Sequence, residues 1–210
     1  MSKQPLSRWQ QFYQDDPKLV EIPPSTCARR AAEIFAADNC RIILDLGCGT
    51  GRDSIHLADN ETQVIGLDAA HSGLLLAQKR IVDSKSKISW VESDSRVLPF
   101  SDAFFDGVYC FGLLHEFVGE SARGDVNRTL KEVRRVLKPA GAAIIAVSAG
   151  DPKKGLPHVQ NFSEVMFDAA TSEFRCIEKK VYDDLGCTGR SDYKVWFGYF
   201  VKVERGRSDA

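Results

Sequence analysis

The fold of this chain is decided by residues 41–51, which read RIILDLGCGTG. Residues 41–46 are mostly apolar and end at a glycine-rich turn, a pattern that predicts a buried strand. Glycine tolerates a positive φ and lets a ligand approach the backbone closely. A helical pattern follows, and the N-terminus of a helix favours an anionic group. Taken alone, the stretch predicts either a ligand-binding loop or an ordinary tight turn between a strand and a helix.

Strand and helix patterns alternate outward from this loop, beginning at Cys27. Short apolar runs predict further strands at residues 63–67, 87–91, 105–111 and 142–147. The helix before the last of these strands is marked by apolar residues at helical spacing: Val126, Leu130, Val133 and Leu137. We expect Pro139 and Gly141 to end this helix. Such alternation is typical of a parallel sheet with helices on both faces.

The pattern changes towards the C-terminal end of the chain. Residues 162–170 predict a helix, and residues 174–182 and 193–203 predict two strands. The connection between the strands passes through Gly186 and Gly189 and is too short for a helical crossover, so the strands should pair antiparallel. The chain is therefore predicted to be an α/β protein with a seven-stranded open sheet, mostly parallel. The expected organisation is a helical extension or lid at residues 1–24, one domain at residues 25–205 and a tail at residues 206–210.

The composition argues against several classes of partner. Lys and Arg total 28, Asp and Glu total 29, and the formal net charge is −1. This balance gives no electrostatic reason to expect nucleic acid or a membrane surface as a partner. No apolar run is long enough to cross a bilayer and the N-terminus has no apolar signal core, so we expect a cytoplasmic protein. The six cysteines form no C-x-x-C pair and no zinc-ligand spacing, so we expect reduced thiols and no metal site.

Acidic residues stand where the next two strands end. Asp68 follows the strand at residues 63–67, and Asp94 follows the strand at residues 87–91. In an open α/β sheet, an acid at this edge can bind the hydroxyls of a ribose, and a second acid can accept a hydrogen bond from an exocyclic amine. Each acid alone is equally typical of a turn. Because the glycine-rich loop and both acids converge on one crevice, the sequence favours a nucleoside-containing ligand.

These features bring the chain close to a known family. It resembles class I S-adenosylmethionine-dependent methyltransferases, particularly those that act on small molecules. The resemblance runs from about Ile42 to Val147 and rests on four segments: LDLGCGTG (44–51), GLDAA (66–70), ESDSRVLPFSDAFFDGVYC (92–110) and LKEVRRVLKPAG (130–141). It implies a Rossmann-like, doubly wound sheet, S-adenosylmethionine as the cofactor, and transfer of a methyl group to a small-molecule acceptor by in-line displacement.

The resemblance also assigns roles to residues of this chain. The loop would shape the pocket for the methionine part of the cofactor, Asp68 would hold the ribose, Asp94 would contact the adenine, and Phe111 and Leu113 would flank the reacting methyl. The full set of expected cofactor-binding residues is Asp45, Gly47, Cys48, Gly49, Thr50, Gly51, Asp68, Ala69, Asp94, Ser95, Phe111 and Leu113. One departure is Ala70, where many relatives carry a Ser or Thr that caps the next helix. Because alanine cannot cap, we expect Ser72 to do so one turn later.

His115 is the candidate general base, because it follows the strand at residues 105–111 and lies beside the expected methyl position. The alternative is a histidine that orders its loop through a backbone hydrogen bond. A base is needed only if the acceptor must lose a proton, since the leaving group departs neutral. No catalytic triad is therefore expected.

Two groups of residues, most of them aromatic, allow two interpretations each. Trp9, Phe12 and Tyr13 belong either to a lid that excludes water from the site or to an amphipathic helix packed on the sheet. The C-terminal strands carry a second group that either packs in the core or, through residues 192–194, rims a substrate pocket: Tyr182, Asp183, Tyr193 and Trp196.

Two other functions compete with methyl transfer. A nicotinamide-dependent oxidoreductase would carry G-x-G-x-x-G to hold a pyrophosphate, whereas this chain has G-x-G-x-G at Gly47, Gly49 and Gly51. The other alternative is a non-catalytic protein that binds S-adenosylmethionine and acts through a partner. The sequence does not specify the acceptor, the atom that is methylated or the oligomeric state.

Overall fold

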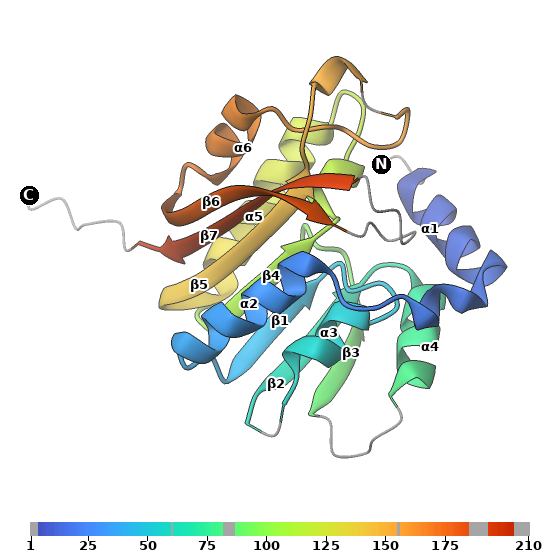
Figure 1. Ribbon diagram of the computed structural model, residues 1–210, viewed down its shortest axis with the longest axis horizontal. Helices are drawn as coiled ribbons and strands as arrows, with labels where there is room; N and C mark the ends of the chain where they lie inside the picture. The colour runs from blue at the N-terminus through green and yellow to red at the C-terminus, as the bar shows by residue number, and fades with distance from the viewer. Residues whose placement is uncertain (1–3, 60, 82–86, 155, 185–192, 204–210) are drawn as a thin grey trace, which may run out of the picture.

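The computed structural model describes residues 4–59, 61–81, 87–154, 156–184 and 193–203 and places seven strands in one sheet (Figure 1). The strand order is β3-β2-β1-β4-β5-β7-β6. The strands are β1 (Ile42–Leu46), β2 (Gln63–Asp68), β3 (Ile88–Glu92), β4 (Phe105–Phe111), β5 (Leu137–Ser148), β6 (Phe174–Asp184) and β7 (Tyr193–Lys202). The first five are parallel, and β7 runs antiparallel between β5 and β6. The predicted fold class is confirmed, including the antiparallel pair at the C-terminal end.

The helices cover both faces of this sheet, as a doubly wound fold requires. In Figure 1, α2 (Thr26–Ala37) and α3 (Arg52–Leu57) lie in front of the strands, and α5 (Ala122–Val136) and α6 (Glu164–Thr171) lie behind them. Two cores follow from this arrangement. One packs side chains of α5 and α6 against the sheet, and the other packs α2 and α3 against the opposite face.

The order of the strands creates a crevice at β1. The chain leaves β1 towards β2 and β3 on one side and returns to β4 on the other, so the connections diverge there. In open parallel sheets, ligands bind beyond the carboxyl ends of the strands at such a switch point. The glycine-rich loop follows β1 directly and therefore occupies this position.

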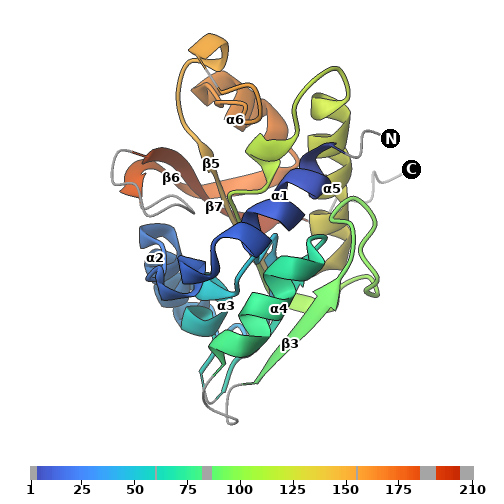
Figure 2. The same cartoon turned by 90° about the vertical axis from the view of Figure 1, so that its right-hand side faces the viewer.

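The N-terminal region forms two helices outside the repeating pattern. They are α1 (Gln4–Asp15) and the short 3-10 helix η1 (Pro17–Glu21). Figure 2 shows α1 crossing in front of the carboxyl end of the sheet, beside α4 (His71–Arg80). This region is therefore helical, and α1 packs on α4.

The helix α5 ends one residue earlier than its apolar spacing predicts. α5 stops at Val136, and Leu137 is already extended and begins β5, so Pro139 and Gly141 lie inside that strand. The residue before a proline is driven out of the helical region, so the helix has to end before Lys138. Leu137 then pairs with Phe105 ahead of an irregularity in the ladder between β4 and β5.

The expected cap of α4 is wrong. The helix begins after Ala70, which supplies no side-chain cap, and Ser72 lies within its first turn. The backbone N–H of Ser72 donates to Gln10 Oε1 and its hydroxyl donates to the carbonyl of Gln10. The free amide at the start of α4 is therefore satisfied by α1, a contact between segments far apart in the sequence.

Several negative findings apply to the described part of the chain. Among its helices, none has the length and apolar character that a membrane span requires. The same residues contain no group of three or more His, Cys, Asp or Glu side chains suited to a metal ion. Cys27, Cys40, Cys48 and Cys110 are buried with free thiols, and Cys187 lies outside the described residues.

Candidate functional site

A cavity of about 1100 Å³ lies at the carboxyl ends of the parallel strands, at the switch point of the sheet. It brings together nearly all of the predicted site residues: Asp45, Gly47, Cys48, Gly49, Thr50, Asp68, Ala69, Asp94, Ser95, Phe111, Leu113 and His115. Gly51 does not line the cavity. It has φ +70° and starts α3, and a side chain there would collide with the Trp90 ring. Its contribution is to the packing of the loop on β3.

The glycine-rich loop is fastened to the neighbouring strand. The backbone N–H groups of Gly47 and Cys48 donate to the carbonyl of Leu67 at 2.8 and 3.1 Å. Gly49 has φ +53°, and a Cβ there would lie 2.5 Å from the Tyr13 hydroxyl. A residue with a side chain would therefore be strained at this position and would also push away α1.

Asp68 joins this loop to the start of α4. Its Oδ2 accepts the N–H of Gly49 and its Oδ1 accepts the N–H of Ala70, both at 2.8 Å. Burial raises the pKa of the carboxyl, and the backbone hydrogen bonds oppose that shift. Each carboxylate oxygen can accept more than one hydrogen bond, so both retain capacity for a ligand hydroxyl.

Asp94 is held by a two-pronged contact with Arg96, whose Nε and Nη2 donate to its carboxylate oxygens. The hydrogen bonds from Arg96 lower the pKa of Asp94. Arg96 also donates to Asp125 at 3.0 Å, which anchors the pair on α5. The ionised Asp94 carboxylate therefore has a fixed position in the cavity wall, suited to an amine donor.

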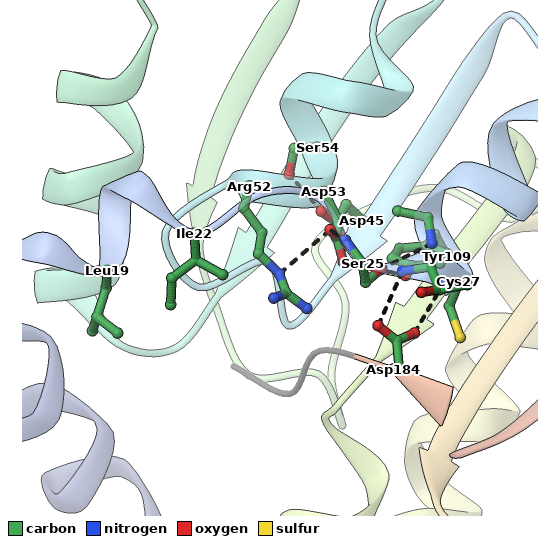
Figure 3. A network of polar contacts seen from close by, with 12 residues as sticks. Leu19, Ile22, Ser25, Cys27, Asp45, Arg52, Asp53, Ser54, Tyr109 and Asp184 are labelled. Carbon is green, nitrogen blue, oxygen red and sulfur yellow. Dashed lines mark hydrogen bonds and ion pairs between the residues drawn. The ribbon is translucent and has the colours of Figure 1, made fainter. Parts of the chain in front are cut away.

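A buried polar network lies at the end of the cavity formed by β1, α3 and the start of α2 (Figure 3). The Ser54 hydroxyl donates to Asp45 Oδ2, and burial raises the pKa of Asp45 to about 8. The carboxylate of Asp53 accepts the N–H and the hydroxyl of Ser25, each at 2.9 Å, and the Tyr109 hydroxyl at 3.2 Å. These bonds tie β1, α3, β4 and the start of α2 together beneath the loop.

Arg52 reaches into the same region, as Figure 3 shows, with its guanidinium beside Asp53. The Nε of Arg52 lies 3.4 Å from Asp53 Oδ1, and its guanidinium carbon lies 5.3 Å from the centre of the Phe111 ring. The Arg52 side chain is 9% exposed and lines the cavity. A buried cation and the acid Asp45 thus share one end of the cavity, which suits a group that carries both an ammonium and a carboxylate.

Side chains of the α1 helix form one wall of the cavity. Tyr13 packs between the positions of Gly49 and Gly73, and the Trp9 ring stacks on the Tyr13 ring at 5.3 Å. Phe12 packs edge-on against Trp9 at 5.1 Å, and all three aromatic residues line the cavity. The aromatic side chains of α1 therefore form part of the cavity wall, and their action as a lid stays a prediction.

His115 lies on the short 3-10 helix η2 (Leu114–Glu116) after β4. Its Nδ1 accepts the backbone N–H of Ser148 at 3.0 Å, and burial lowers its pKa to about 3. Because Nδ1 is an acceptor, the neutral ring carries its hydrogen on Nε2. This is the backbone bond of the loop-ordering interpretation, and a ring already protonated at Nε2 is poorly suited to act as a base.

Glu116 is the residue that sequence reasoning missed at this end of the cavity. It is buried, and its Oε2 accepts the indole N–H of Trp9 at 3.1 Å and forms an ion pair with Arg8. Burial raises its pKa to about 7, while Arg8 and the Trp9 bond oppose that shift. Both partners are on α1, more than a hundred residues away in the chain, so no local motif marked this position.

Two of the C-terminal aromatic residues, Tyr182 and Trp196, are partly buried and pack against the core. The Trp196 indole N–H donates to the carbonyl of Phe162, and Tyr182 packs edge-on against Phe197 at 5.3 Å. Lys194 does line the cavity and pairs with Asp183 at 2.6 Å. Asp192 lies outside the described residues, so a rim at residues 192–194 stays a prediction.

Comparison with known proteins agrees with this geometry. A family model described as a methyltransferase domain matches residues 43–141. The O-methyltransferase rstn1 of Aspergillus nomiae is 29% identical over 151 residues, 67% of this chain and 64% of that protein. A demethylmenaquinone methyltransferase of Clavibacter sepedonicus is 36% identical over 111 residues, 52% of this chain and 42% of the relative. The chain thus spans less than two thirds of the length of either relative.

A solved structure has the same fold over most of the chain. It is the 1,6-didemethyltoxoflavin-N1-methyltransferase of Burkholderia thailandensis, with bound 1,6-didemethyltoxoflavin and S-adenosylhomocysteine. The TM-score is 0.62 at 19% identity, with 85% of this chain and 79% of that chain covered. Residues 43–141 therefore match the model of a methyltransferase domain, and the chain shares its fold with a solved methyltransferase structure.

Proposed function

We propose that this protein transfers a methyl group from S-adenosylmethionine to a small-molecule acceptor. The observation that carries the proposal is the cavity at the switch point, where the glycine-rich loop, Asp68 and Asp94 line one wall. The glycine-rich loop lets a ligand approach its backbone closely. Asp68 can accept hydrogen bonds from a ribose diol, and Asp94 can accept one from an adenine amino group. The family assignment of residues 43–141 points the same way.

The chemistry of the cavity fits each part of S-adenosylmethionine. Asp45 and Arg52 at the network end suit the ammonium and the carboxylate of the methionine part, and Asp68 suits the ribose hydroxyls. The cofactor supplies an electrophilic methyl group on a positively charged sulfur. The protein has to hold the acceptor on the axis of that methyl, and such positioning is worth roughly 7–11 kcal/mol.

The size and closure of the cavity favour a small acceptor. Ligand pockets commonly span roughly 300–1,000 Å³. The volume of about 1100 Å³ therefore exceeds what one small ligand needs. Side chains of α1 form part of the cavity wall, which narrows the access for a folded macromolecule. The methyltransferases similar to this chain include one named for O-methylation and one whose bound acceptor is 1,6-didemethyltoxoflavin.

The test is calorimetric titration of S-adenosylmethionine and S-adenosylhomocysteine into the protein. A micromolar dissociation constant corresponds to about −8 kcal/mol. A hydrogen bond to a charged group contributes about 1.5–3 kcal/mol, so Asp68→Ala should weaken both ligands by at least about tenfold. Glu92→Ala is the matched control, because Glu92 pairs in register with Asp68 on β3 but does not line the cavity.

Three outcomes distinguish the proposed function from its alternatives. Tight binding that Asp68→Ala weakens and Glu92→Ala does not, with methylation of at least one small molecule, supports the proposal. Tight binding without turnover favours the non-catalytic alternative. A folded protein that binds a nicotinamide nucleotide and neither methionine-derived ligand contradicts the proposal.

A further inference from the structure

Glu116 is an acidic residue of the cavity that the proposed binding of the cofactor does not use. Glu116 ends η2, and its backbone N–H donates to the carbonyl of Leu113 at 3.0 Å. Leu113 in turn packs on the glycine-rich loop, since a Cβ at Gly47 would lie 3.0 Å from Leu113 Cβ. This tight turn places the Glu116 carboxyl in the cavity wall, on the far side of Leu113 from the glycine-rich loop.

The two oxygens of Glu116 have different surroundings. Oε2 takes the Trp9 indole N–H and the Arg8 guanidinium, both from α1. Oε1 lies 3.8 Å from His115 Nε2. The side chain is 9% exposed and lines the cavity. The contacts from α1 therefore hold one oxygen in place and orient the carboxyl, while the other oxygen is on the side of His115.

We propose that Glu116 accepts the proton of a hydroxyl acceptor, a phenol or an enol, when the methyl group is transferred. This inference rests on the proposed methyltransferase function and names the class of its acceptor. His115 is a positioning residue in this scheme. Its ring is fixed through Nδ1 by the backbone of Ser148, and its Nε2–H is directed towards the same end of the cavity as Glu116.

The class of acceptor follows from the need for a base. A neutral amine is already nucleophilic and can lose its proton after the transfer, whereas a neutral hydroxyl has to lose its proton as the new bond forms. The proton of the hydroxyl passes to a Glu116 oxygen, and the oxygen's electron pair forms the bond to the methyl carbon. The carbon–sulfur bond breaks with its electron pair left on sulfur. One carboxylate and one sulfonium become a carboxylic acid and a thioether, so charge balances.

The electrostatics of the site suit this role. A general base works best with a pKa near the operating pH, and burial raises the pKa of Glu116 to about 7. The charged and titratable groups that face it are Arg8 from α1 and His115 from η2. Further along the cavity, His158 faces Arg8 and its pKa is lowered by burial and by Arg8. An ionised Glu116 is therefore favoured by Arg8 and opposed by burial.

The experiment compares two phenols of similar size, 4-methoxyphenol and 4-nitrophenol, at a mildly alkaline pH where only the nitrophenol is largely ionised. General-base catalysis contributes about 10²–10⁴-fold, so Glu116→Gln should lower kcat/KM for 4-methoxyphenol by at least about a hundredfold. The loss with 4-nitrophenol should be less than about tenfold, because that acceptor has already lost its proton. Glu120→Gln is the control, because Glu120 is an exposed glutamate just beyond η2.

A pH profile supplies a second readout that a structural role would not move. The rate with 4-methoxyphenol should rise with pH through the pKa of Glu116, and Glu116→Gln should remove that rise. Arg8→Met should move the rise to higher pH, because Arg8 lowers the pKa of Glu116. Calorimetry of S-adenosylhomocysteine with each variant shows whether the cofactor site is intact.

Equal losses with both phenols, or an unchanged pH profile in Glu116→Gln, would overturn the proposal. If the unaltered protein binds S-adenosylmethionine but methylates neither phenol, the hydroxyl class is wrong and the inference falls while the proposed function stands. If the folded protein does not bind the cofactor, the proposed function fails first and the inference falls with it.

Discussion

Asp45 shows how one side chain can link ligand binding to a proton. It is next to last in β1, with its carboxyl buried against Ser54 and close to Asp53. Burial disfavours the charged form, and a second carboxylate nearby disfavours it further. With a pKa raised to about 8, the carboxyl is mostly protonated at neutral pH in the free protein. A positively charged ligand at this end of the cavity favours the ionised form.

We therefore predict that S-adenosylmethionine binding at about pH 7 releases close to one proton from Asp45. Affinity should rise as pH increases towards the raised pKa of about 8, because less work is then spent on removing the proton. Calorimetry in buffers that differ in ionisation enthalpy measures the release. Asp45→Asn should abolish it, and Asp59→Asn, an acid in the exposed turn after α3, should not. Binding enthalpies that do not depend on the buffer would contradict this prediction.

The residues of the site differ in how visible they are in the sequence. Asp68 and Asp94 were predicted because they stand where strands end, and the carboxyl ends of parallel strands meet at one edge. Asp45 was predicted from the family resemblance. Arg52 and Glu116 were not predicted, because the Phe111 ring beside Arg52 and the Arg8 and Trp9 side chains at Glu116 are brought to them only by folding. The tautomer of His115 depends on the backbone of Ser148, a contact that no spacing encodes.

At the scale of elements, α1 joins three parts of the site. It caps α4 through Gln10, packs Tyr13 on the glycine-rich loop and holds Glu116 through Arg8 and Trp9. A single helix therefore spans the proposed cofactor and acceptor regions. A segment with these contacts can become ordered when a ligand binds and can slow the release of that ligand.

Deleting residues 1–16 should make S-adenosylhomocysteine dissociate at least about tenfold faster, which is about 1.4 kcal/mol of lost affinity. The physical reason is the loss of the aromatic cover, since burying one large apolar side chain contributes about 1.5–3 kcal/mol. Stopped-flow measurement of release checks this. Tyr13→Ala should show part of the effect and Gln14→Ala, on the exposed side of α1, none. Unchanged release after the deletion would argue against a lid.

Element boundaries were harder to predict than element types. The strand at residues 105–111 agrees with β4, because a nearly continuous run of buried residues defines it. The end of α5 was misplaced because Leu137 continues the apolar spacing of the helix while the Lys138–Pro139 pair forces extended backbone. The cap of α4 comes from another element, so the local sequence at Ala70 did not contain it.

At the scale of the whole molecule, the last part of the chain is fastened to the first. Asp184, at the end of β6, accepts the backbone N–H groups of Thr26 and Cys27, both at 3.0 Å. These are free amides at the start of α2, which Ser25 also caps. The buried network therefore links β6 to α2 and, through Asp53, to the floor of the cavity.

Asp184→Ala should lower the free energy of unfolding by about 0.5–2 kcal/mol, because it leaves helix-terminal amides without a partner. For a chain of this size the melting temperature should fall by roughly 2–4 °C for each kcal/mol. Asp183→Ala is the matched control, since its surface pair with Lys194 contributes little. Thermal unfolding of both variants measures the difference, and equal effects would contradict the role of Asp184.

The place of β7 has a consequence for biosynthesis. β7 lies between β5 and β6, although both of them are made before it. Until translation has passed Lys202, β5 has no partner along the edge that pairs Ala142 with Val201, and β6 has no strand to join. Unpaired apolar strand edges promote association between chains. The late delivery of β7 thus leaves the growing sheet open to association with other chains until β7 is in place.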